Sequence, residues 1–251
     1  MAGSLPWKTA WITGASTGIG RDVALQLSAA GVRVAASARS AEKLGALGTG
    51  VLAVPLDVTD AAACRSAVAR IESELGPIDL AVFGAGTYSP VTTEELDPAR
   101  FAHMMETNYM GVVNCLAALA PGMIERRSGH LSWIASVAGY MGLPKAAAYG
   151  PTKAALINLA ESLYPEMRAK GVSVSVINPG FVETPLTAQN DFEMPFLMKP
   201  EEAARRTIKG LAAGRFEVAY PRRFVAILKA VRLLPYPIFF RLIARAVLKS
   251  G

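Results

Sequence analysis

The sequence contains only two cysteines and two histidines in 251 residues, and this scarcity excludes several classes of protein. Cys64 and Cys115 are too few for a disulfide framework, so we expect two buried thiols in a reducing compartment. The cysteines, His103 and His130 show no spacing typical of metal ligands. No metal site is therefore predicted.

Long apolar runs are also missing. The N-terminal residues MAGSLPWK lack the continuous apolar stretch of a signal peptide. The longest uncharged run near the C-terminus, Leu233–Phe240, is far shorter than the ~20 apolar residues of a spanning helix. We expect a cytoplasmic protein, and leave open whether it associates with the inner surface of the membrane.

Acidic residues are absent from the C-terminal segment 220–251, which holds seven lysines and arginines. The remaining residues, 1–219, carry 19 basic and 20 acidic groups, so the net charge of +6 arises in the tail. A nucleic-acid-binding face across the whole protein is therefore not expected.

Apolar residues make up 52% of the chain, enough for one large core. Strand-like runs occur at 10–13, 32–36, 51–55, 80–83, 129–134 and 172–177, and helical patterns lie at 19–30, 61–75, 98–125 and 149–170. Because parallel strands need crossover connections, this order predicts a doubly wound, mostly parallel α/β sheet of Rossmann type. We expect three α/β/α layers with a helical, apolar and basic C-terminal extension.

Residues 13–20 read TGASTGIG and join the first predicted strand to the first predicted helix. Gly14 can adopt backbone conformations that other residues avoid. Gly18 and Gly20 lack a Cβ, so the main chain can approach a pyrophosphate at the positive end of the helix. A plain glycine-rich turn is the alternative, but the flanking strand and helix favour dinucleotide binding.

The second predicted strand ends in Ala36-Ser37-Ala38-Arg39-Ser40, without a carboxylate. Enzymes of this fold that bind NAD usually carry an acidic residue here for the ribose hydroxyls, whereas an arginine accommodates the 2′-phosphate of NADP. Arg39 can form charge-assisted bonds to such a phosphate. The sequence therefore favours NADP(H).

Tyr149 and Lys153 lie four residues apart, which places them on one face of a helix. We expect the lysine cation to lower the phenol pKa, so that Tyr149 acts as a general acid or base. Ser136, after the fifth predicted strand, can polarise a substrate oxygen. Asn108 lies inside a long helical pattern although asparagine is a poor helix former, which indicates a local kink or a bound water.

Together these motifs resemble the short-chain dehydrogenase/reductase family in its compact single-domain form, over about residues 8–215. The matches follow in order: TGASTGIG at 13–20, Asp57-Val58, Gly84-Ala85-Gly86, Asn108, Ser136, Tyr149 with Lys153, and Pro179-Gly180 with Thr184. The family usually has Asn-Asn-Ala-Gly where this chain has Phe83-Gly84-Ala85-Gly86, and we expect a slightly looser sheet–helix junction. Pro151-Thr152 replaces the usual Ala-Ser, and Pro151 fixes a helix start close to Tyr149.

The resemblance implies a division of roles among these residues. The catalytic residues would be Asn108, Ser136, Tyr149 and Lys153. Arg39 joins the cofactor-binding residues through the charge argument above. The full set expected to bind the cofactor is Gly14, Ser16, Thr17, Gly18, Ile19, Gly20, Arg39, Asp57, Val58, Ala85, Gly86, Tyr149, Lys153, Pro179, Gly180, Val182 and Thr184. The family places a lid over the substrate in the region after Thr184, and its residues here are largely apolar. We expect substrate contacts from Ser136, Tyr140, Met141, Leu143, Tyr149, Phe192 and Phe196.

These features predict a dinucleotide-binding and catalytic domain at 1–219, extended by residues 220–251. The function expected is NADP(H)-dependent hydride transfer to or from a carbonyl or secondary alcohol carbon of a lipophilic small molecule. A catalytically silent NADP(H)-binding regulator or scaffold at a membrane surface is the alternative. The tail segment 222–249 either contacts a membrane or packs on the protein. By analogy with the family, a homodimer or homotetramer is expected.

Overall fold

A seven-stranded parallel sheet forms the centre of the computed structural model, which describes residues 5–190 and 192–247. The strand order is β3-β2-β1-β4-β5-β6-β7. The strands are β1 (Thr9–Thr13), β2 (Arg33–Ser37), β3 (Val51–Ala53), β4 (Leu80–Phe83), β5 (His130–Ile134), β6 (Ser173–Pro179) and β7 (Glu217–Tyr220). The first six confirm the predicted strands to within two residues at each end.

The seventh strand was not predicted, because four residues that begin with a glutamate form no apolar run. It exists through pairing with β6, in register from Val176 opposite Glu217 to Pro179 opposite Tyr220. This partner gives β7 its backbone hydrogen bonds, which its own sequence does not signal.

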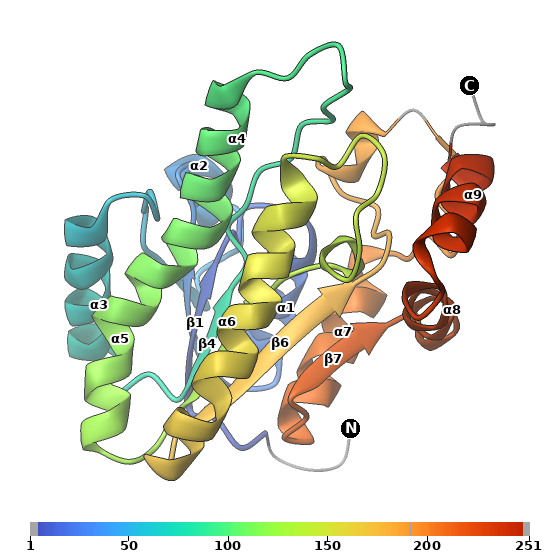
Figure 1. Ribbon diagram of the computed structural model, residues 1–251. Coiled ribbons are helices and arrows are strands. Elements are labelled where there is room, and N and C mark those ends of the chain that lie inside the picture. Colours follow the sequence, from blue (N-terminus) through green and yellow to red (C-terminus); the bar gives the residue numbers. More distant parts are fainter. Residues whose placement is uncertain (1–4, 191, 248–251) are drawn as a thin grey trace.

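Helices cover both faces of the sheet, as the doubly wound prediction requires (Figure 1). On one face α3 (Ala61–Leu75), α5 (Gly111–Glu125) and α6 (Tyr149–Ala169) bury Ile71, Leu119 and Leu156. On the other face lie α1 (Gly18–Ala29), α2 (Ala41–Gly45) and α7 (Pro200–Ala212). The strands are buried between these layers, as parallel strands generally are. The three-layer Rossmann-type fold is confirmed.

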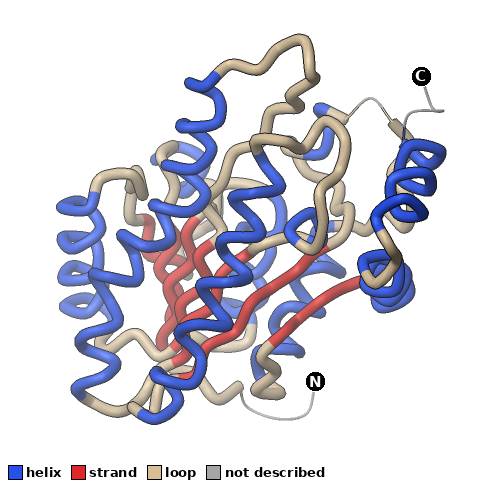
Figure 2. Tube along the Cα trace, viewed as in Figure 1, coloured by secondary structure: helices blue, strands red, loops and turns tan. Residues whose placement is uncertain are grey.

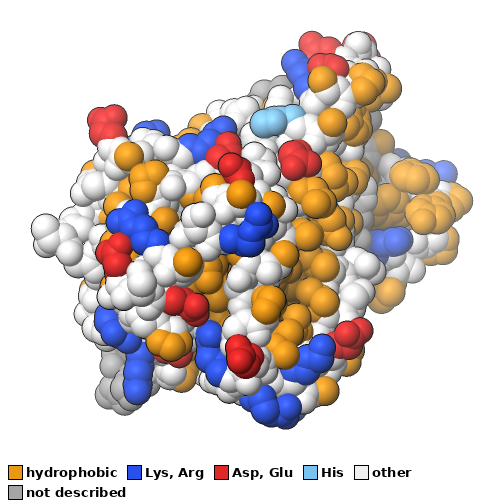
Figure 3. Space-filling view, turned by 90° about the vertical axis from the view of Figure 1, so that its left-hand side faces the viewer, with side chains coloured by type: hydrophobic (Ala, Val, Ile, Leu, Met, Phe, Trp, Pro, Cys, Tyr) orange, Lys and Arg blue, Asp and Glu red, His pale blue; other side chains and the backbone are white. Residues whose placement is uncertain are grey.

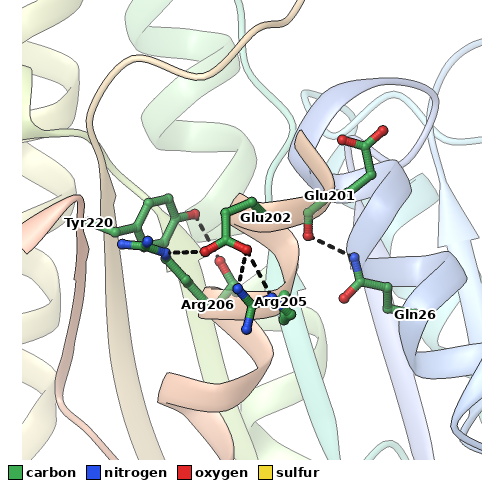
Figure 4. Close-up of polar contacts among 7 residues, drawn as sticks. Gln26, Glu201, Glu202, Arg205, Arg206 and Tyr220 are labelled. Atoms are coloured by element: carbon green, nitrogen blue, oxygen red, sulfur yellow. Dashed lines mark hydrogen bonds and ion pairs between the residues drawn. The ribbon is translucent and has the colours of Figure 1, made fainter. Parts of the chain in front are cut away.

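Helix α7, which the strand and helix pattern did not predict, holds α1 in place. Gln26 of α1 donates a 2.9 Å hydrogen bond from Nε2 to the backbone oxygen of Glu201 at the start of α7 (Figure 4). Within α7, Glu202 forms ion pairs with Arg205 and Arg206. The phenol of Tyr220 lies 2.9 Å from the hydroxyl of Thr207, which joins α7 to β7.

The predicted helix 98–125 is divided in the structure. It comprises α4 (Pro98–Met105), a π-helical turn η1 (Glu106–Met110) and α5. Asp97 begins α4 by accepting a hydrogen bond from the backbone of Ala99. The interruption falls around Asn108, where we expected either a local kink or a bound water.

The C-terminal tail forms two helices, α8 (Arg222–Arg232) and α9 (Tyr236–Val247), at the edge of the molecule beyond β7 (Figure 1). Residues 248–251, including Lys249 of the predicted segment 222–249, lie outside the described residues. Within the described chain, no helix combines the length and apolar character needed to cross a bilayer.

The two cysteines are buried free thiols, as predicted, and their sulfur atoms lie 3.8 Å apart between α3 and α5. Across residues 5–190 and 192–247, no cluster of three or more histidine, cysteine or acidic side chains could hold a metal ion.

Candidate active site

The loops at the carboxyl ends of the strands bring the predicted site residues to one edge of the sheet, uppermost in Figure 2. Gly14 and Gly18 both have positive φ angles, +69° and +57°. A Cβ on Gly18 would lie 2.8 Å from Cγ2 of Thr184, so the structure brings these two predicted cofactor residues into contact. The turn therefore requires glycine at both positions. Thr17 directly precedes α1, and Ile19 and Gly20 lie in its first turn.

A cleft of about 420 Å³ opens beside this turn. Seven of the predicted cofactor residues line it: Gly14, Ser16, Arg39, Asp57, Val58, Ala85 and Gly86. The Asp57 carboxylate accepts hydrogen bonds from the backbone and hydroxyl of Thr59, and these hold its pKa below the usual value. The nearby Arg39 and His103 lower it further.

Lys43 also lines this cleft and was not among the predicted residues. It lies on α2, four residues after Arg39, and its backbone N–H donates to the hydroxyl of Ser40. The helix thus places a second cation beside the end of β2. No local pattern in the sequence signalled this, because the position of Lys43 depends on where α2 packs after its Ser40 cap.

At Gly84, where the family usually has asparagine, contacts with Thr13 and Ile134 define the junction. The hydroxyl of Thr13 accepts hydrogen bonds from the backbone N–H groups of Gly84 and Ala85, at 3.1 and 3.3 Å. A Cβ on Gly84 would lie 2.9 Å from Cδ1 of Ile134. The space of a larger side chain is therefore filled by Ile134.

Asn108 is fully buried in the π-helical turn. Its Oδ1 accepts a 2.7 Å hydrogen bond from the backbone N–H of Thr87, and its Nδ2 donates to the Thr87 oxygen at 3.0 Å. Nδ2 also donates to the hydroxyl of Thr152, which itself donates to the backbone oxygen of Tyr149 at 2.7 Å. Asn108 thus connects the β4 loop to the start of α6.

Tyr149 begins α6, as Pro151 predicted, and Lys153 follows one turn later. The Nζ of Lys153 lies 5.4 Å from the centre of the Tyr149 ring and donates a 2.8 Å hydrogen bond to the backbone oxygen of Ile134. Ser136 follows β5, forms a side-chain hydrogen bond with Tyr149, and accepts one from Ala138 N–H. All four predicted catalytic residues therefore lie in one connected cluster.

Burial governs the protonation of this cluster. It raises the pKa of Tyr149 to about 12, against the hydrogen bond with Ser136, and the neighbouring Tyr88 raises it further. It lowers the pKa of Lys153 to about 8. We expected Lys153 to lower the Tyr149 pKa; the net direction is opposite, because desolvation of the phenolate outweighs the favourable contacts.

An apolar cavity of about 280 Å³ adjoins Tyr149. Of the predicted substrate residues, Ser136, Leu143, Tyr149 and Phe192 line it, and Gly180 lies on its wall. Tyr88 was not predicted; its ring packs edge-on against Tyr149 at 5.1 Å, and its hydroxyl donates to Asn190. The remaining wall includes Phe224, Leu228 and Ile243 of the tail helices, whose approach to this cavity the sequence did not indicate.

Three predicted substrate residues do not line this cavity. The side chain of Tyr140 faces β7 and donates a hydrogen bond to Glu217 there, so it is not part of the cavity wall. Met141 is buried among Val225, Leu228 and Phe239 of the tail. Phe196 is half exposed.

The residues after β6 run from the cavity towards the glycine-rich turn. Gly180 donates a 2.7 Å backbone hydrogen bond to Tyr220, following Pro179 at the end of β6. Val182 is buried and bridges to Met198. Thr184 then lies against Gly18. These four predicted cofactor residues, Pro179, Gly180, Val182 and Thr184, thus lie between the cleft and the cavity.

Comparison with known proteins agrees with this geometry. The short chain dehydrogenase family model matches residues 8–194. An uncharacterized oxidoreductase of Myxococcus xanthus is 39% identical, covering 94% of this chain and 96% of the relative. The 3-oxoacyl-(acyl-carrier-protein) reductase FabG of Escherichia coli is 36% identical over an aligned region that covers 72% of this chain and 75% of FabG.

The solved structures agree as well. A short chain dehydrogenase from Burkholderia cenocepacia in complex with NADP superposes with a TM-score of 0.83 at 26% identity, covering 94% of this chain and 97% of the other. The chain belongs to the short chain dehydrogenase family and is an oxidoreductase.

Proposed function

We propose that this protein is an NADP(H)-dependent reductase or dehydrogenase that acts on a lipophilic carbonyl or secondary alcohol, with Tyr149 as general acid and base. The observation that carries this proposal is the position of Tyr149. Its side chain touches Ser136 and lies one helical turn from Lys153, on the wall of an apolar cavity. The family relatives support the reaction class, and the FabG relative is itself a ketone-reducing enzyme by name.

The residues fit a nicotinamide dinucleotide. Packing requires glycine at Gly14 and Gly18, where a Cβ would collide with Gly84 and Thr184. The turn leads into the start of α1, whose first N–H groups lack partners within the helix and can bind a pyrophosphate. The cleft lined by Asp57, Val58 and Ala85 extends from this turn to Arg39. When bound, the nicotinamide supplies or accepts the hydride.

Tyr149 transfers the proton in this proposal. With a pKa near 12, the phenol is protonated at neutral pH and can donate from Oη to a carbonyl oxygen. The hydroxyl of Ser136 polarises the same oxygen. Lys153 stabilises the phenolate that forms, and Asn108 acts as a positioning residue by holding Thr152 at the start of α6.

The preference for NADP(H) is supported by the charges at the end of β2. Arg39 and Lys43 both line the cleft there, and no carboxylate follows β2 at this point. Two cations can bind a 2′-phosphate, whereas NAD carries only a hydroxyl at that position. The matching solved structures include one complex with NADP and one with NAD, so the proposed preference rests on these two cations.

The lipophilic substrate class is supported by the cavity lining. Leu143, Phe181, Phe192, Phe224 and Leu228 surround the space next to Tyr149. Apolar cavities with few polar groups bind molecules that bury hydrocarbon.

We also propose that the chain forms a homodimer or homotetramer. Viewed from the α3 side, the surface carries a strip of hydrophobic side chains (Figure 3). Leu159, Leu163 and Tyr164 of α6 are only partly buried in the single chain. A second copy packed here would remove them from water.

The proposal is tested with a panel of short ketones, 3-oxoacyl thioesters, long-chain ketones and ketosteroids, each assayed with NADPH and NADH. We expect NADPH-dependent reduction of the lipophilic members. Tyr149→Phe should lower kcat by about 10²- to 10⁴-fold while NADPH binding, followed by fluorescence, is retained. Near-normal turnover in this variant would show that another residue donates the proton. Cofactor binding without turnover on any panel member would favour the silent scaffold instead.

A further inference from the structure

The tail helices have two apolar faces, and only one is covered. The inner face packs on the domain, where Val225, Leu228 and Phe239 are buried with Val137 and Met141. The outer face leaves large apolar side chains in water, with exposed fractions between 41% and 86%: Ile227, Leu233, Tyr236, Ile238, Phe240 and Leu242. We call these six residues the outer face.

The exposed apolar surface is concentrated in this region. Of ten exposed large hydrophobic side chains in the described chain, six belong to the outer face. Two more, Phe196 and Leu197, lie on the segment after β6 that borders the cavity, and the Phe196 ring packs 5.8 Å from Phe224 of α8. A surface of this kind marks an interaction site.

The same helices are strongly basic. Arg222, Arg223, Arg232, Arg241 and Arg245 are all exposed, and no acidic residue occurs between 220 and 251. Lys229 pairs with Glu217 of the domain. Apolar side chains flanked by arginines on short helices match the chemistry of an anionic bilayer surface.

The charge also argues against a second copy on this face. In a two-fold interface each patch meets its own copy, which would bring two sets of arginines together without acidic partners. The tail helices lie at the end of the molecule opposite α3 (Figures 1 and 2).

The inner side of these helices borders the cavity next to Tyr149. Phe224 and Leu228 of α8 and Ile243 of α9 form part of its lining, together with Phe192 and Pro195. A single layer of helices therefore separates the exposed apolar surface from the site.

We propose that the outer face docks on an anionic lipid bilayer, and that substrate dissolved in the bilayer enters the cavity between α9 and the segment 192–198. The docking surface stands on its own observations, whereas the entry route rests on the proposed function. The tail lies on the bilayer, because no described helix is long enough to span one. Substrate partitioned into lipid is thereby presented to Tyr149 without passing through water.

Vesicle sedimentation tests the docking. The full chain is mixed with vesicles of phosphatidylcholine, with and without phosphatidylglycerol. We expect binding to the phosphatidylglycerol vesicles, weakened at least tenfold in Ile238→Ser/Phe240→Ser and in Arg241→Glu/Arg245→Glu. The matched controls are Leu96→Ser, at another exposed leucine, and Arg65→Glu on α3; both should sediment like the wild type.

Point substitutions at exposed positions are preferable to deleting the tail, because deletion would uncover Val137 and Met141. Circular dichroism melting verifies that each variant is folded. Equal sedimentation of the wild type and both double variants would overturn the proposal, as would failure of the wild type to bind. A variant that lowers the oligomer mass in ultracentrifugation, without any vesicle binding by the wild type, would identify the outer face as a subunit interface.

An activity assay tests the entry route. A long-chain methyl ketone in phosphatidylglycerol vesicles should be reduced at least fivefold more slowly by Ile238→Ser/Phe240→Ser, whereas a short methyl ketone in water should be reduced at the wild-type rate. Equal loss on both ketones would refute the route. If the wild type binds vesicles but reduces no carbonyl of the panel, the proposed function fails while docking stands.

Discussion

The phenol of Tyr140 donates a 2.6 Å hydrogen bond to the carboxylate of Glu217. The same carboxylate accepts a 2.9 Å hydrogen bond from Asn178 and pairs with Lys229. It therefore ties the loop after β5, strand β6 and helix α8 to β7. Burial opposes ionisation of Glu217, but these three hydrogen bonds outweigh it and hold its pKa below the usual value.

Glu217→Gln should lower the free energy of unfolding at neutral pH by about 2 kcal/mol, because Lys229 and Tyr140 lose a charged partner. A carboxyl with a depressed native pKa stabilises the fold above its unfolded pKa, and this contribution is lost as the pH falls through the native value. The difference between variant and wild type should therefore shrink on acidification in urea titrations. If the stability difference between variant and wild type does not depend on pH, the role assigned to Glu217 is wrong. The control is Glu95→Gln, which removes an exposed ion pair with Arg100.

Lys153→Met should abolish activity and yet stabilise the protein. The burial that lowers the Lys153 pKa to about 8 is a cost to the charged form at neutral pH. A group whose native pKa is lowered in this way makes the wild type gain stability as the pH rises from about 8 towards 10. The substitution also removes the hydrogen bond from Lys153 to the backbone oxygen of Ile134, and this loss offsets part of the gain. Urea unfolding at pH 7 should therefore show the variant more stable than the wild type by roughly 2 kcal/mol. A less stable variant would contradict this account of burial.

Arg39→Ala and Lys43→Ala should each raise the KM for NADPH about tenfold, because each removes a charge-assisted contact to the 2′-phosphate. Kinetics with NADH should hardly change, since NADH lacks that phosphate. Arg65→Ala on α3 serves as a control for loss of a surface cation. Equal effects on both cofactors would place these two side chains away from the phosphate.

Thr152→Val should destabilise the protein by about 1 to 3 kcal/mol and lower kcat, because the Asn108 amide and the Tyr149 carbonyl lose their shared hydroxyl. Thr152→Ser keeps the hydroxyl and should restore most of both properties. Thermal unfolding and kcat are measured for the two variants. Equal behaviour of the valine and serine variants would mean that the hydroxyl positions nothing.

Much of the fold was predictable because its signals are local. The glycines of 13–20 mark the turn, Pro151 marks the start of α6, and six strands are apolar runs. Strand β7 has no such run and depends on pairing with β6. The mid-helix position of Asn108 indicated a local kink or a bound water, and the structure has a π-helical turn there.

Local patterns predicted six of the strands, the four long helical segments between them, the glycine-rich turn, and the Tyr149 and Lys153 pair, since each depends on residues within a few positions of one another. Packing of the whole chain brought Lys43 to the cleft, Tyr88 against Tyr149, and Ile243 to the cavity. It also set the direction of the Tyr149 pKa and turned Tyr140 towards Glu217. Burial and contacts between distant segments arise only when the chain is packed, so no local pattern encodes them.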